Sequence, residues 1–159
     1  MLPGMTASEP HPTPAWAAGL PLDHVAIATD DLDVGAAPFT LLGLQVDGDD
    51  EDVPMQRVRV RMLRAGAVRI ELLAPMRGDG DDGPVARFLT KRGPGLHHVA
   101  FRVADLQAEL TRLRAAGIEL IDDAPRPGHG GTRVAFVHPR SAAGVLVELV
   151  QHGRPDDRA

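Results

Sequence analysis

The sequence predicts a small α+β domain built from two copies of one unit. The segment LDHVAIATDDL at residues 22–32 returns as LHHVAFRVADL at residues 96–106, with Leu, His, Val, Ala, Asp and Leu at matching positions. Each copy is followed by a helix-like stretch and later by a strand-like segment with a central Glu, at Glu71 and Glu148. Solenoids need three or more repeats, so two copies indicate a pseudo-twofold domain.

The first unit reads as a strand, a helix and a hairpin. Residues 22–29 form an apolar run that predicts a strand, and the acidic residues after it are typical of a helix start. Helical spacing follows over residues 32–42, where Gly35 and Pro38 predict a short or irregular helix. Residues 47–52 are acidic or Gly and predict a solvated loop. Residues 58–63 and 68–73 predict a hairpin with arginines facing solvent or a partner.

A helix opened by Pro84 and stopped by Gly93 links the units. The second unit then predicts a strand from residue 96, a helix over 105–116, and strands at 119–122, 133–138 and 145–150, with a Pro/Gly loop at 124–131. We therefore expect a domain over residues 21–152, with units at about 21–76 and 95–152. Residues 1–20 are expected to be a flexible lead and residues 153–159 a tail.

Composition narrows the possible functions. A chain of 159 residues fits one domain. The absence of cysteine means that any metal is held by His, Asp, Glu or Gln. A net charge of -5 and an aromatic content of 3% argue against nucleic acid as a partner. No apolar run approaches the roughly 20 residues of a membrane span, and residues 1–20 lack a signal-peptide pattern. We expect no membrane association and a cytoplasmic location.

Four residues at matched positions predict a metal site. His24 and Glu71 in the first unit correspond to His98 and Glu148 in the second, and a twofold axis would bring all four together. Each Glu interrupts an apolar strand, and a buried carboxylate is costly unless it is paired or coordinated. Two imidazoles and two carboxylates suit Co²⁺, Ni²⁺, Mn²⁺, Zn²⁺ or Fe²⁺. A lone strand His is more often structural, but repetition at matched positions favours the metal site.

The other histidines give weaker signals. His97 points to the face of its strand opposite His98. His129 lies in the Gly-rich loop, where a substrate contact and an ordinary surface position both stay open. His11 and His152 lie near the two ends of the chain and are expected to be solvated.

Several segments together resemble the methylmalonyl-CoA epimerase family of the glyoxalase, or vicinal oxygen chelate, superfamily. The resemblance covers residues 22–151 and is carried by LDHVAIATDDL, IELLAP, FLTKRGPGLHHVAF, GHGGTRVAFVHPRS and GVLVELVQ. KRGPGLHHVAF and HPRSAAGVLVEL are the specific segments, because the four ligand positions alone would mark only the superfamily.

The resemblance implies paired βαβββ modules that form a metal-lined sheet cleft, a divalent metal that is often cobalt, and a homodimer. The implied ligands are His24, Glu71, His98 and Glu148, the same four as above. The implied reaction inverts the α-carbon of an acyl-CoA substrate, methylmalonyl-CoA, by proton abstraction. A Lewis acid that binds the carboxylate and thioester oxygens would stabilise the enolate. Inversion needs acid-base groups on both faces, and Glu148 and Glu71 are the implied catalytic residues.

One departure from the family leaves the second base open. In some members a Glu in the strand that holds Gln56 is the second base, but this chain has Val58, Val60 and three arginines there. Gln56 itself matches a Gln that the family often has at the pocket mouth, so it is an expected substrate contact. Arg140, Lys91 and Arg92 are candidates by position for binding the CoA moiety.

Two other functions use the same fold. A glyoxalase I type isomerase, which acts on thiol hemithioacetals, has the same ligand set, but it usually follows its first metal-binding Glu with a polar stretch. This chain has Leu72-Leu73-Ala74-Pro75 instead, which favours the epimerase. A metal-free binding module would lack the full ligand set, so the presence of all four residues argues against it.

Overall fold

The structure is a computed structural model that describes residues 19–76 and 83–153. Nearly all of the predicted lead and tail, and His11 with them, lie outside these residues, so the expected limits of the domain and its two units stay a prediction. Within the described residues, no helix is both long and apolar enough to cross a membrane.

The helices and strands follow the predicted order closely. The first module contains β1 (Leu22–Ala28), α1 (Leu32–Leu41), β2 (Gln45–Val46), β3 (Glu51–Val53), the 3-10 turn η2 (Pro54–Gln56), β4 (Val58–Ala65) and β5 (Val68–Pro75). After α2 (Pro84–Arg92), the second module contains β6 (Gly95–Arg102), α3 (Leu106–Ala115), β7 (Arg126–Pro127), η3 (His129–Gly131), β8 (Arg133–Val137), η4 (Pro139–Ser141) and β9 (Val147–Gln151).

Matched aspartates start the corresponding helices of the two modules. The side chain of Asp31 accepts hydrogen bonds from the backbone N–H groups of Asp33 and Val34 at the start of α1. Asp105 accepts one from Ala108 N at the start of α3. These bonds satisfy backbone donors that a helix leaves unpaired in its first turn. The repeated Asp of the two sequence segments is therefore a helix cap.

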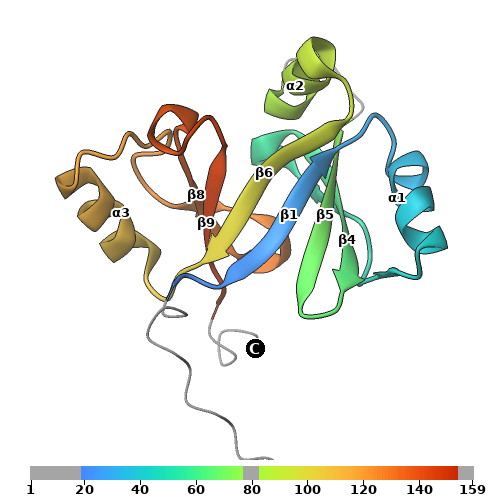
Figure 1. The fold of residues 1–159 in the computed structure, drawn as a ribbon, viewed down its shortest axis with the longest axis horizontal. Helices are drawn as coiled ribbons and strands as arrows, with labels where there is room; N and C mark the ends of the chain where they lie inside the picture. Colours follow the sequence, from blue (N-terminus) through green and yellow to red (C-terminus); the bar gives the residue numbers. More distant parts are fainter. Residues whose placement is uncertain (1–18, 77–82, 154–159) are drawn as a thin grey trace, which may run out of the picture.

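The two modules join side by side in one mixed sheet within a single chain. The strand order is β2-β4-β5-β1-β6-β9-β8-β7, and β3 pairs with β4. β1 and β6 pair antiparallel at the centre, with Ala26 opposite His98 (Figure 1). Outside them, β5 runs parallel to β1 and β9 runs parallel to β6. This symmetry confirms the predicted pseudo-twofold α+β fold.

Strand alternation divides the sheet into two faces. On one face, α1 packs against β4 and β5, and α3 packs against β8 and β9 (Figure 1). Leu72 and Leu149 belong to these helix-covered clusters. Because side chains alternate along a strand, their neighbours Glu71 and Glu148 point to the other face, which we call the inner face. It also carries Ala26, and all three residues are buried.

Two local predictions were wrong. The acidic segment at residues 47–52 is not only a solvated loop, because β3 pairs with β4 and Asp50 forms a two-point ion pair with Arg61. The β4 arginines thus have partners within the chain. The strand predicted at residues 119–122 is reduced to a single bridge between Leu120 and Val137. β7 pairs with the other end of β8, at Arg133 and Val134.

Candidate metal centre

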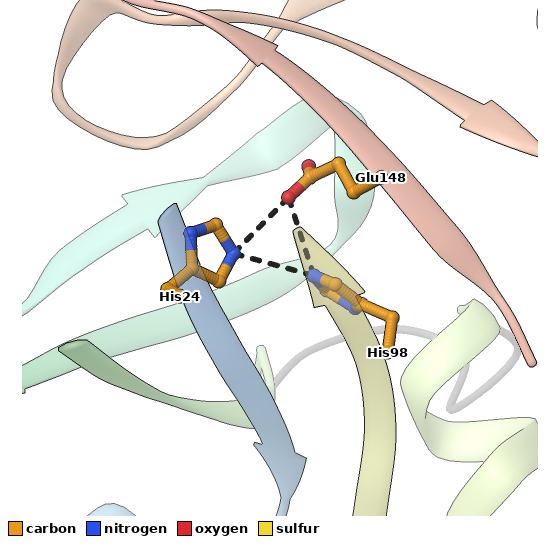
Figure 2. Close-up of side chains that lie close together, drawn as sticks. All are labelled: His24, His98 and Glu148. Atoms are coloured by element: carbon orange, nitrogen blue, oxygen red, sulfur yellow. Dashed lines mark hydrogen bonds and ion pairs between the residues drawn. The ribbon is translucent and has the colours of Figure 1, made fainter. Parts of the chain in front are cut away.

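Four side chains from the central strands β1, β5, β6 and β9 meet on the inner face. Glu148 Oε2 lies 3.1 Å from His24 Nε2 and 3.2 Å from His98 Nε2, and the two Nε2 atoms are 3.4 Å apart. Figure 2 shows these three side chains pointing toward one another. Glu71 Oε2 lies 3.3 Å from His24 Nε2 and 3.7 Å from His98 Nε2. All four residues are buried.

The cluster has the properties of a metal site. Oε2 of Glu148 is buried and has no hydrogen-bond partner, although both imidazoles lie close to it. Donor atoms held about 2.1 Å from one ion lie about 3 to 3.5 Å from each other, which matches the spacing between these atoms. The two Nε2 atoms face each other and share at most one hydrogen bond. A divalent cation would satisfy all of these donors at once.

A buried aspartate supports the cluster from behind. Asp23 Oδ1 lies 3.0 Å from Nδ1 of His24, so the other ring nitrogen of His24 is directed at the ligand cluster. The same carboxylate accepts hydrogen bonds from Arg69 and from Arg102 and contacts His152 Nε2 at 2.6 Å. Metal-binding histidines commonly have such a carboxylate on their second nitrogen. Asp23 therefore fixes both the tautomer and the direction of His24.

Sequence reasoning missed this support. His152 is not a solvated bystander as expected, because it contacts Asp23 at the end of β9. The available signal was the charge of Asp23 inside an apolar strand. Its partners could not be found in the same way, because they come from β5, β6 and the end of β9.

The electrostatics of the cluster explain why it would take a cation. Burial alone would lower the pKa of His24, but its contacts with the carboxylates of Asp23, Glu148 and Glu71 raise it to about 11. Burial opposes the charge on Glu148, yet its contacts with His24 and His98 hold its pKa below the ordinary value. A proton on His24 balances the carboxylates, and a bound metal ion would replace that proton.

The cluster opens into a cavity of about 230 Å³. His24, Glu71 and Glu148 line it, and so does Gln56, which donates a hydrogen bond to the carbonyl of Pro127. The structure thus brings this predicted substrate contact to the cavity. Arg140 is not among the residues that line it. Its side chain is exposed and its guanidinium lies 3.5 Å from Glu119.

A second cavity, of about 730 Å³, reaches His98 from the side of α2. Lys91 and Arg92 line it, as does His97. Nδ1 of His97 lies 2.9 Å from Nδ1 of His98. Burial and the neighbouring His98 lower the pKa of His97 to about 4, so this ring is neutral at pH 7. It is a suitable partner for the second nitrogen of His98.

The fold and this cluster define a class of protein. The model of the glyoxalase/bleomycin resistance protein/dioxygenase superfamily matches residues 23–136, and the chain belongs to this superfamily.

Within it, the chain resembles one kind of enzyme. An ethylmalonyl-CoA/methylmalonyl-CoA epimerase from Cereibacter sphaeroides is 39% identical over 82% of this chain and 96% of its own length. The crystal structure of methylmalonyl-CoA epimerase from Mycobacterium tuberculosis is similar with a TM-score of 0.79 and 38% identity, over 87% of this chain and 91% of that one. A methylmalonyl-CoA epimerase from Streptomyces coelicolor, solved with 2-nitronate-propionyl-CoA, has a TM-score of 0.78 and 36% identity, over 85% and 96% of the two chains.

Proposed function

We propose that this protein is a divalent-metal-dependent epimerase of methylmalonyl-CoA. The observation that carries the proposal is the cluster of His24, Glu71, His98 and Glu148, in a chain that is similar over 82% of its length to an epimerase of that substrate. Cobalt is our expected ion, with nickel, manganese, zinc and iron(II) compatible with the same nitrogen and oxygen donors.

The four side chains would hold the ion, with Asp23 and His97 orienting the two imidazoles. When bound, a divalent ion supplies a Lewis acid that makes a proton next to a thioester carbonyl easier to remove. We assign the carboxylate of Glu148 as the group that accepts the α-proton, with Glu71 as the other carboxylate within the cluster.

The second cavity offers a place for part of the CoA moiety. Lys91 and Arg92 lie along it, and His98 forms part of the same lining. Cationic side chains suit the phosphate groups of CoA. We assign Gln56 to the acyl end of the substrate because it lines the first cavity, and keep Arg140 as a candidate CoA contact at the exposed turn after β8. Methylmalonyl-CoA and ethylmalonyl-CoA differ by one methylene, which separates substrates by only about 1 to 3 kcal/mol.

A homodimer accounts for apolar side chains that the single chain leaves exposed. Leu41 is 89% and Leu42 is 77% exposed at the end of α1, and Val46 on the nearby edge strand β2 is 47% exposed. Adjacent apolar groups of this kind are typical of protein interfaces. The cytoplasmic location expected from the sequence stays a prediction.

The test follows the α-proton of methylmalonyl-CoA by proton NMR in D₂O. We expect fast exchange with the Co²⁺-loaded protein, none after the metal is stripped, and a loss of about 100-fold or more for Glu148→Gln. Glu109→Gln is the control, because this carboxylate pairs with Arg112 on α3, away from the cluster. Absence of exchange in metal-loaded protein would refute the epimerase proposal, and thiol hemithioacetals would then be the substrates to test.

A further inference from the structure

Epimerisation needs a second acid-base group, and the first cavity offers few. The substrate proton leaves one face of the α-carbon and a new proton must arrive at the other face. The β4 wall of the cavity provides only apolar side chains, Val60 and Met62. The Asp, Glu and His residues that line the cavity are Asp23, His24, Glu71, His129, Glu148 and His152.

Most of these residues already have a structural task. His24, Glu71 and Glu148 belong to the ligand cluster. Asp23 accepts hydrogen bonds from arginines and contacts both His24 and His152. His152 lies just beyond β9, the strand that carries Glu148, and its Nε2 is directed at Asp23. His152 therefore helps to hold Asp23, the residue that orients the ligand His24. His129 is the remaining titratable residue among those that line the cavity.

His129 is held by a residue of the other module. Its Nε2 lies 3.3 Å from Glu51 Oε2, and the same oxygen accepts a hydrogen bond from Gly130 N at 2.9 Å. A second bond between the modules runs from Gln56 Nε2 to the carbonyl of Pro127. Polar contacts thus connect residues 126–131 to β3 and η2. A carboxylate on one ring nitrogen orients an imidazole.

This contact places His129 across the cavity from the ligands. β3 pairs with β4, and Glu51 is opposite Val60, the apolar residue of the cavity wall. β7, which precedes His129, lies at the far end of the sheet order from β4. The sheet must therefore curl until its two ends touch, with the ligand-bearing strands β5, β1, β6 and β9 between them. A substrate in the cavity meets carboxylates on the inner face and an imidazole on the side of the Glu51 contact.

We propose that His129, oriented by Glu51, is the second acid-base residue of the epimerisation, an assignment that rests on the proposed function above. Glu148 takes the α-proton, the C–H electron pair moves onto the thioester carbonyl oxygen, and the His129 imidazolium donates a proton to the opposite face as the pair returns to carbon. Glu148 then loses its proton to water and His129 regains one. For the other epimer, His129 takes the proton and Glu148 donates.

The experiment incubates each epimer of methylmalonyl-CoA separately in D₂O with metal-loaded His129→Gln. We expect inversion to fall about 100-fold or more. One epimer, whose α-proton faces Glu148, should still exchange with solvent without inverting, and the other should do neither. Metal affinity measured by calorimetry should be unchanged, because His129 is not a ligand. The matched control is His152→Gln, which removes a cavity imidazole on the ligand side and should not separate exchange from inversion.

Several results would overturn the assignment. Inversion by His129→Gln at the unaltered rate would exclude an acid-base role, and equal loss of exchange for both epimers would indicate a structural role. Separation of exchange from inversion in His152→Gln in place of His129→Gln would transfer the role to His152. Failure of the proposed function itself looks different, because the unaltered, metal-loaded protein would then exchange neither epimer.

Discussion

Replacement of Asp23 by Asn tests how the metal centre is supported. The carboxylate keeps the proton of His24 on Nδ1 and leaves Nε2 to face Glu148 and His98. An amide in its place can donate to Nδ1, which moves the ring proton to Nε2 and blocks the nitrogen meant for the metal. Loss of such a supporting carboxylate typically weakens metal affinity about 10- to 100-fold. This corresponds to about 1.4 to 2.7 kcal/mol of binding free energy.

The same variant should also be less stable without metal. Asp23 is 2% exposed and has three basic partners besides His24, and removing one partner of a buried ion pair costs about 3 to 5 kcal/mol. The side chains of Arg69, Arg102 and His152 are partly exposed and can be solvated when the carboxylate is lost. We therefore expect a loss of unfolding free energy near the lower end of this range. Urea unfolding of the metal-free protein measures this loss.

The assay for affinity is calorimetric titration with Co²⁺, with Asp50→Asn as the matched control. Asp50 also holds arginines through a partly buried carboxylate, but it lies by β4 on the outer side of the first module and contacts none of the four ligands. We expect Asp50→Asn to lose stability and keep its metal affinity. Unchanged affinity in Asp23→Asn, or an equal loss in both variants, would refute the argument that Asp23 orients His24.

Two further predictions concern the proton at the cluster and the apolar surface. Because contacts with three carboxylates raise the pKa of His24 to about 11, a metal ion must displace the proton of this ring. Co²⁺ affinity should therefore rise between pH 6 and 8, and calorimetry in buffers of different ionisation heat should show release of about one proton. An affinity that does not depend on pH or buffer would contradict this. Leu41 is apolar and 89% exposed, so Leu41→Glu should convert a dimer to a monomer in analytical ultracentrifugation. The control Glu109→Gln should remain a dimer. A dimer that persists in Leu41→Glu would place the interface elsewhere.

The repeat in the sequence predicted which residues would meet because strands have a fixed side-chain period. Leu72 and Leu149, which pack against helices, follow Glu71 and Glu148 directly in their strands. Because side chains alternate, the two carboxylates point to the opposite face, where they meet His24 and His98. A symmetric fold repeats this arrangement in both modules. The meeting of the four residues could therefore be predicted before any contact was known.

Contacts between residues that have no counterpart in the other module could not be predicted in this way. The Glu51–His129 pair joins β3 to the loop after β7, two segments far apart in the sequence whose contact depends on how far the sheet curls. Pairing of the two modules within one chain depends on β1 meeting β6, and the sequence allowed pairing across a dimer as well. The strand expected at residues 119–122 stops at one bridge, because the side chain of Asp122 accepts the hydrogen bond of Phe136 N in place of a backbone carbonyl.

The most direct test of the central claim is to count the divalent ions bound per chain and measure their affinity in the protein and in four variants, His24→Ala, Glu71→Ala, His98→Ala and Glu148→Ala. We predict one Co²⁺ per chain, and a weaker affinity in every variant, because an oxygen of each carboxylate lies within 3.7 Å of both Nε2 atoms. Binding of no ion by the unaltered protein, or full affinity in any one of the variants, would contradict the four-ligand centre.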